Sequence, residues 1–158
     1  MFDSNGLDKY NIIATKKVAI KEKGMKLSSK THYGLIACHI LGRNYPDKLV
    51  PASMLENHIS VSGKYLEKIM RLLSSRNIVV ASRGANGGYM LARAPEDITI
   101  GEIVRTLEDD MVLIPCVASE GKCKCCPTSG VWKKLYESIN IVLDKMTLKQ
   151  MLDGDIKW

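Results

Sequence analysis

The fold is decided by the stretch SGKYLEKIMRLLSSRNIVV, residues 62–80, in which a helical pattern runs directly into a strand pattern. Ser62 can accept hydrogen bonds from the free backbone N–H groups of the first helical turn. Apolar residues repeat at helical spacing and predict one buried stripe: Leu66, Ile69, Leu72 and Leu73. The opposite face holds Lys64, Glu67, Lys68 and Arg71. Long and mostly positive side chains suit phosphates and base edges, although an ordinary solvated helix face has the same composition.

The residues after this helix predict a β-hairpin. Residues 78–82 are rich in β-branched side chains, residues 83–88 read RGANGG, and residues 89–92 form a second strand pattern. The glycines permit a tight turn and a close approach of backbone to a narrow groove. Arg83, with Gly84 beside it, is therefore predicted to enter the DNA minor groove. The alternative is a solubilising residue at the tip of an ordinary turn.

Two further helical patterns precede the opening stretch. One runs from Ser28 or Ser29 to about Arg43, and the other opens with Pro51, continues from Ala52 and ends near His58. Three helices with a tight connection before the third predict a helix-turn-helix, and the hairpin after it predicts a wing. Because these signals agree, we expect DNA binding. The predicted DNA-binding residues are Ser62, Lys64, Tyr65, Glu67, Lys68, Arg71, Arg83 and Gly84.

Charge is distributed unevenly along the 158 residues, whose formal net charge is +6. Residues 25–94 hold 10 Lys or Arg against 3 Asp or Glu, giving +7, whereas residues 95–158 hold 8 against 11, giving −3. The basic part suits a polyanion. No apolar run approaches the roughly 18 residues of a membrane span, and residues 1–24 lack the pattern of a secretory signal. We therefore expect a soluble cytoplasmic protein.

The first 24 residues are weakly patterned. Lys21 and Glu22 precede Met25 and can be encoded by a ribosome-binding sequence. Our hypothesis is that Met25 is the native start and that residues 1–24 are a non-native or disordered extension. Residues 25–94 would then be the winged helix-turn-helix domain, and residues 95–158 a cysteine-loop sensor region with a dimerisation helix.

Residues 131–145 predict a long amphipathic helix, after a shorter helix that begins at residues 97–99 and before a last one capped by Thr147. Its apolar face comprises Trp132, Leu135, Ile139, Val142, Leu143 and Met146. This face needs a partner. We expect the same helix of a second subunit, because palindromic operators are read by two-fold dimers. Folding back onto its own winged domain is the alternative.

Four of the five cysteines fall within eleven residues: Cys116, Cys123, Cys125 and Cys126. In a chain without a secretory signal, such a cluster favours metal binding or redox sensing over disulfides. Cys38 stands apart in an apolar helix, where it is predicted to be a buried small hydrophobe.

The sequence resembles the Rrf-two family of bacterial regulators through several motifs in order. They are MKLSSKTHYGL at 25–35, YLEKI at 65–69, RGANGGY at 83–89, IGEIV at 100–104 and the cysteines ahead of Val131 and Trp132. The resemblance covers residues 25 to about 152. It implies a mainly α fold with a small β-hairpin wing, and a homodimer with the long C-terminal helix crossing between subunits.

The resemblance also implies an iron-sulfur cluster with two or four irons. In the IscR-like branch three loop cysteines hold it; Cys116 and Cys126 match the first and third, and Cys123 is the middle ligand, with Cys125 as the alternative. The IscR-type fourth ligand is a histidine, where this sequence has Ser129. NsrR-like members use an acidic residue of the first helix of the partner subunit, and the equivalent position here is His32. The alternatives are that His32 is a surface residue near DNA, or that Cys125 completes an all-cysteine ligand set.

The function that the resemblance implies is a transcriptional repressor that binds a pseudo-palindromic operator and senses iron-sulfur status, redox state or nitric oxide. One alternative is a clusterless CymR-type regulator of cysteine and sulfur metabolism, or a regulator dependent on thiols or zinc. A redox enzyme that uses the adjacent thiols is disfavoured, because no βαβ pattern surrounds them. We therefore expect a regulator and not an enzyme.

Overall fold

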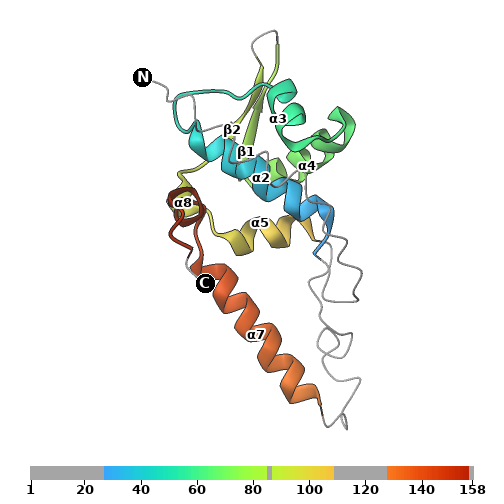
Figure 1. Cartoon of the computed structure of the whole chain (residues 1–158), viewed down its shortest axis with the longest axis vertical. Helices are drawn as coiled ribbons and strands as arrows, with labels where there is room; N and C mark the ends of the chain where they lie inside the picture. The colour runs from blue at the N-terminus through green and yellow to red at the C-terminus, as the bar shows by residue number, and fades with distance from the viewer. Residues whose placement is uncertain (1–26, 85–86, 109–127, 157–158) are drawn as a thin grey trace.

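The computed structural model describes residues 27–84, 87–108 and 128–156. The predicted extension 1–24 and the cysteines at 116–126 lie outside these residues. The helices are α2 (Ser29–Arg43), α3 (Ala52–Ile59), α4 (Gly63–Ser75), α5 (Ile100–Leu107), α7 (Ser129–Lys145) and α8 (Leu148–Asp153), and a short 3-10 helix covers Pro95–Asp97. Strands β1 (Val79–Ser82) and β2 (Gly88–Leu91) form an antiparallel hairpin (Figure 1). The predicted fold class, mainly helical with a β-hairpin wing, is confirmed.

Hydroxyl side chains begin several of these helices, because the first backbone N–H groups of a helix have no partner within it. Ser28, Ser62 and Thr147 each accept a hydrogen bond from the first turn, as predicted from the sequence. Thr99 does the same for α5. Pro51 was expected to open the second helix, but it lies one residue before the first helical position.

The core lies between the helices and the hairpin. Helix α4 buries Leu66, Ile69, Met70 and Leu73. These four residues occupy positions i, i+3, i+4 and i+7, so one face of the helix carries them all. Leu72, which the predicted stripe included in place of Met70, is only half-buried. Cys38 is fully buried as predicted, and its burial raises the pKa of the thiol to about 12.

The wing is anchored to the helical body by its second strand. Val50 and Tyr89 form an isolated bridge, in which each backbone N–H donates to the other's carbonyl at 2.9 Å. A Cβ at Gly88 would lie 2.4 Å from the Val50 carbonyl oxygen, so only glycine permits this approach. The base of the hairpin is thereby held against the segment that leads into α3.

Helices α2 and α5 cross in close contact at Gly34. A Cβ at this position would lie 2.1 Å from Leu107 Cδ1 and 3.5 Å from Ile69 Cγ2. Leu107 and Ile69 are both fully buried, so neither can move aside into solvent. The absent side chain of Gly34 therefore lets α4 and α5 pack together onto α2.

Glu108, directly after α5, holds the N-terminal turn of α2. Its Oε1 accepts from the Ser28 backbone N–H at 2.7 Å, the Ser28 hydroxyl at 2.8 Å and the Thr31 hydroxyl at 2.5 Å. Burial by itself would raise the pKa of Glu108, but these hydrogen bonds and the charge of Lys30 outweigh it and lower the pKa. The carboxylate therefore binds the α2 N-terminus in its charged form.

Helix α7 projects away from the other described elements, and among these α5 and α8 lie beside its C-terminal end (Figure 1). None of its 17 residues, all of which the structure describes, is buried. On the predicted apolar face, Leu135 and Val142 are 44% and 55% exposed, and the other four side chains are half-buried. The described residues thus leave this face partly uncovered. In the described part of the chain, no helix has the length and apolar character needed to cross a membrane.

Replacing Gly34 with alanine should destabilise the fold. The added methyl group overpacks the α2–α5 crossing at a cost of about 1–3 kcal/mol, which exceeds the gain of at most about 1 kcal/mol in helix propensity. Denaturant unfolding measures the change. Gly130→Ala is the control, because a Cβ at Gly130 meets nothing within 4 Å. Equal stability of Gly34→Ala and the unmodified protein would contradict the packing argument.

Glu108→Gln should weaken the fold in a pH-dependent manner. A carboxylate whose pKa is lowered by folding stabilises the protein above its unfolded pKa, and this contribution disappears as pH falls through the folded pKa. The variant should lose about 1 kcal/mol at pH 7, after allowance for solvent screening, and the loss should shrink below about pH 4. Urea unfolding at several pH values tests this. The control is Glu137→Gln on the exposed side of α7; a loss independent of pH would count against the charged cap.

Candidate nucleic-acid interface

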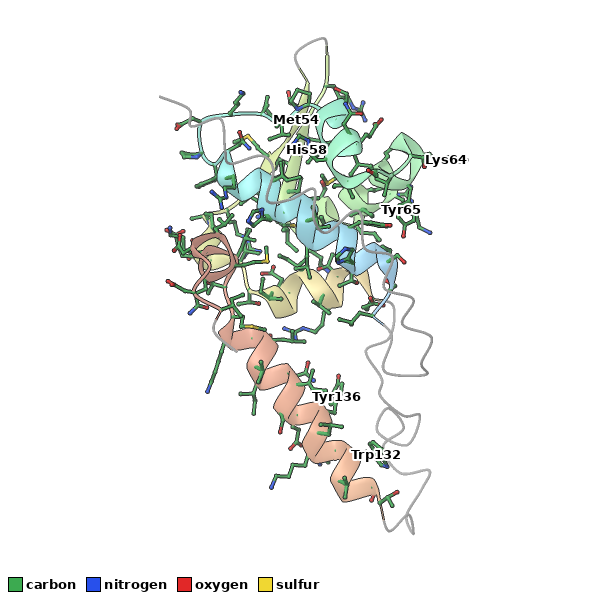
Figure 2. The ribbon with its side chains drawn as sticks, in the orientation of Figure 1. Met54, His58, Lys64, Tyr65, Trp132 and Tyr136 are labelled. Atoms are coloured by element: carbon green, nitrogen blue, oxygen red, sulfur yellow. The ribbon has the colours of Figure 1, made fainter. Side chains whose placement is uncertain are left out.

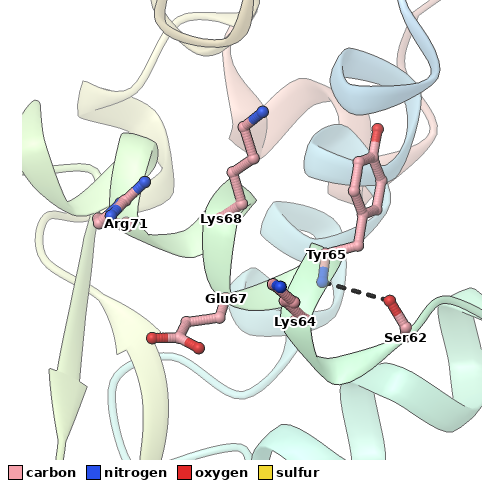
Figure 3. Close-up of a pocket in the computed structure, with 6 residues that line it drawn as sticks. All are labelled: Ser62, Lys64, Tyr65, Glu67, Lys68 and Arg71. Atoms are coloured by element: carbon pink, nitrogen blue, oxygen red, sulfur yellow. Dashed lines mark hydrogen bonds between the residues drawn. The ribbon is translucent and has the colours of Figure 1, made fainter.

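The exposed face of α4 gathers side chains around a shallow surface hollow (Figure 3). The hollow is lined by Ser62, Lys64, Tyr65, Glu67, Lys68 and Arg71. These are six of the eight residues predicted from the sequence to bind DNA. Burial of the opposite stripe against the core fixes which face of the helix reaches solvent, so the structure brings the six together on one surface.

This face of α4 is positively charged and suits a polyanion, but it carries one negative side chain among the cations. Lys64, Lys68 and Arg71 are exposed cations that suit phosphate oxygens and base acceptors. Glu67 is exposed among them and can only accept hydrogen bonds when ionised. Burial raises the pKa of Tyr89, and the charges of Glu67 and then Glu56 raise it further. The Glu67 carboxylate is therefore electrostatically coupled to the base of the wing.

Tyr65 is supported from α2 by a residue that the sequence did not indicate. The rings of Tyr33 and Tyr65 meet edge to face, with centroids 6.2 Å apart and an interplanar angle of 88°. This arrangement is favourable for aromatic pairs and restricts the rotamers of the Tyr65 side chain. The two tyrosines lie on different helices and are 32 residues apart in the sequence, so no local pattern could have paired them.

Arg83 and Gly84 lie on the hairpin and not in the hollow. Arg83 is exposed, and Gly84 has a φ of +111°, a conformation that glycine adopts without strain. The hairpin extends beyond the helical body on its own side of the fold (Figure 1). The structure therefore separates a helix surface from a wing surface, as a winged helix requires for contacts to two grooves.

The predicted metal ligands are divided between described and undescribed residues. Cys116, Cys123, Cys125 and Cys126 lie outside the described residues. His32 is exposed on the first turn of α2, with its ring 5.6 Å from that of Tyr33. The described residues contain no group of three or more His, Cys, Asp or Glu side chains suited to a metal.

Comparisons with known proteins agree with this architecture. The sequence model of the Rrf2 family, described as "Iron-dependent Transcriptional regulator", matches residues 27–154. The chain is 34% identical to the HTH-type transcriptional regulator NsrR of Bacillus subtilis over 132 residues, which is 81% of this chain and 90% of that protein.

Two solved structures are similar as well. IscR of T. potens has a TM-score of 0.69 and 36% identity, over 84% of this chain and 89% of that one. CymR of B. subtilis, the global cysteine regulator, has a TM-score of 0.71 and 26% identity, over 83% of this chain and 98% of that one. The chain therefore belongs to the Rrf2 family and is a winged-helix transcriptional regulator, not an enzyme.

Proposed function

We propose that the chain is a homodimeric repressor that binds a pseudo-palindromic operator through α4 and the wing. The observation that carries the proposal is the cluster of six side chains around one surface hollow on α4 and its N-cap, of which five are exposed and Tyr65 is half-buried. Lys64, Lys68 and Arg71 contact phosphates or base acceptors in the major groove. Arg83, beside Gly84, enters the adjacent minor groove, where the negative potential favours a guanidinium.

Glu67 and Tyr65 give this surface its sequence preference. A glutamate accepts a hydrogen bond from a cytosine amino group, and it repels phosphate where no cytosine is present. Tyr65 contacts the DNA from the adjacent position, with its ring held by Tyr33 at 6.2 Å between centroids. Residues 25–94 thus form the DNA-binding part of the chain.

The partner of α7 is α7 of a second copy. The helix carries Leu135 and Val142, exposed by 44% and 55%, and apolar side chains exposed along a whole helix favour a helical partner. A two-fold dimer also matches a palindromic operator. Residues 95–158 therefore contain both the dimerisation helix and the cysteine segment.

An iron-sulfur cluster is the proposed sensory group. Thiolates are soft anionic donors that suit iron, and Cys116, Cys123 and Cys126 supply them, with His32 as the fourth ligand. When bound, such a cluster supplies a centre that reacts with oxygen and nitric oxide. The choice of His32 rests on its match to the acidic ligand that NsrR-like members take from the first helix of the partner subunit, and on its exposed position on the first turn of α2.

A second candidate is a clusterless regulator of the CymR type. It is favoured by the structural similarity to CymR, at a TM-score of 0.71. The cysteine spacing also favours it, since Cys125 is additional and only two residues separate Cys123 from Cys126. In that case the thiols themselves, or a zinc ion bound to them, would carry the signal.

Glu67→Ala should relax sequence preference without abolishing DNA binding. Removing the acceptor should reduce discrimination at the contacted base pair by about tenfold, while the cations on the same face still bind phosphate. Binding to an operator series with single base changes, and to unrelated DNA, measures both effects. Loss of all binding, including non-specific binding, would show that the assigned role of Glu67 is wrong.

Lys68→Ala is the matched variant on the same helix. It should weaken binding to all DNA sequences alike, and the slope of log K for DNA binding against log salt concentration should fall by about 0.9 in magnitude. An unchanged slope would remove Lys68 from the phosphate contacts.

Protein purified without oxygen should absorb visible light, and Cys116→Ser should abolish this absorption because one thiolate ligand is lost. Cys125→Ser should retain it if Cys123 is the middle ligand. Cys38→Ala is the control, since this thiol is buried in the core. Colourless protein with stoichiometric zinc, or with no metal after reconstitution, would reject the cluster and favour the second candidate.

A further inference from the structure

Helix α5 is fastened to the winged part of the molecule by Arg93. The Arg93 Nη2 atom pairs with Glu102 Oε1 of α5 at 2.5 Å. The same guanidinium donates through Nε to the Asn77 carbonyl at 3.1 Å and through Nη1 to the Asp97 carbonyl at 3.0 Å. Asn77 lies just after α4, so α5 is connected to the end of the helix that carries the DNA face.

The same helix holds α7 through Arg105, one turn further along. Arg105 Nη1 donates to Asn140 Oδ1 at 3.1 Å, and Nη2 pairs with the Asp144 carboxylate. Asn140 and Asp144 are four residues apart, which places them on one face of α7. A planar guanidinium that binds two points a helical turn apart restricts both the rotation and the tilt of that helix.

Backbone contacts fix the C-terminal end of α7 but not its direction. The Ile100 N–H donates to the Met146 carbonyl, and the Leu148 N–H donates to the Ile98 carbonyl, each at 2.8 Å. A Cβ at Gly101 would lie 2.4 Å from Asp144 Oδ1, so α7 approaches α5 closely there. Beyond this point α7 extends away from the body, and Trp132 and Tyr136 project from its distal half (Figure 2).

We infer that Arg105 is the positioning residue that sets the angle between α7 and the winged domain, and thereby the operator half-site spacing that the dimer prefers. The inference rests on the proposed dimerisation through α7. With 17 residues, α7 is about 25 Å long. A rotation of about 10° at its base would displace its far end by about 4 Å, which is comparable to the rise of about 3.4 Å between base pairs.

The Arg105 pair suits an orienting role better than a stabilising one. The side chains of Arg105 and Asp144 are 41% and 50% exposed, and exposed ion pairs contribute little to folding stability. Loss of the pair should therefore leave the fold intact but allow the angle between α7 and the winged domain to vary. The dimer should then accept a wider range of spacings between operator half-sites, which a purely structural role of Arg105 would not produce.

The test uses the full chain and operators with identical half-sites whose central spacing differs by single base pairs. Arg105→Ala should reduce the discrimination against operators one base pair too long or too short by about fivefold. Its affinity for a duplex with one half-site should equal that of the unmodified protein. The charge swap Arg105→Asp with Asp144→Arg should restore the discrimination.

Lys149→Ala is the matched control, because it removes an exposed ion pair of 2.9 Å to Asp153 that lies within α8 and does not join two helices. Its spacing profile should be unchanged. An Arg105→Ala variant that stays dimeric by light scattering and keeps the original spacing profile would overturn the role of Arg105 alone. A monomeric unmodified protein would overturn both this inference and the proposed dimer.

Discussion

The close crossing of α2 and α5 at Gly34 is the constraint on which the rest of the structure depends. Because Gly34 has no side chain, Leu107 of α5 and Ile69 of α4 occupy the space against α2, at 2.1 and 3.5 Å from the position of an absent Cβ. Three helices therefore meet at one backbone position inside the core. The direction in which α4 presents its charged face is fixed by the same packing that fixes α5.

Helix α5 consequently contacts both the winged helix-turn-helix elements and helix α7, which follows it in the chain. Its Glu102 is paired to Arg93 at the wing exit, its Arg105 holds α7, and Glu108 after it caps α2. All three contacts come from a helix of eight residues, five of them buried, or from the residue directly after it. A shift of α7 or of the first turn of α2 relative to the charged face of α4 must therefore break a charged contact made by α5 or its flanking residue.

Much of the local architecture could be predicted from the sequence, because it depends on residues within one or two turns of each other. Hydroxyl caps at Ser62 and Thr147 act over three residues, and the apolar period of α4 places its charged face opposite its core stripe. The change from helical to alternating pattern after Asn77 likewise predicted the hairpin. The four charged residues of the α4 surface followed from the same period.

The sequence by itself thus determined the elements, their caps and the polar face of α4, whereas only the tertiary structure decided which elements meet. Glu108 and Ser28 are 80 residues apart, and Arg105 and Asp144 are 39 apart. Such pairs depend on which helices cross and at what angle, and the contact between Gly34 and Leu107 sets this angle for α2 and α5. For the same reason Tyr33 as the support of Tyr65 was not predicted, and Met70 replaced Leu72 in the core. Local periodicity specifies a face, but the shape of the neighbouring helix specifies its partner.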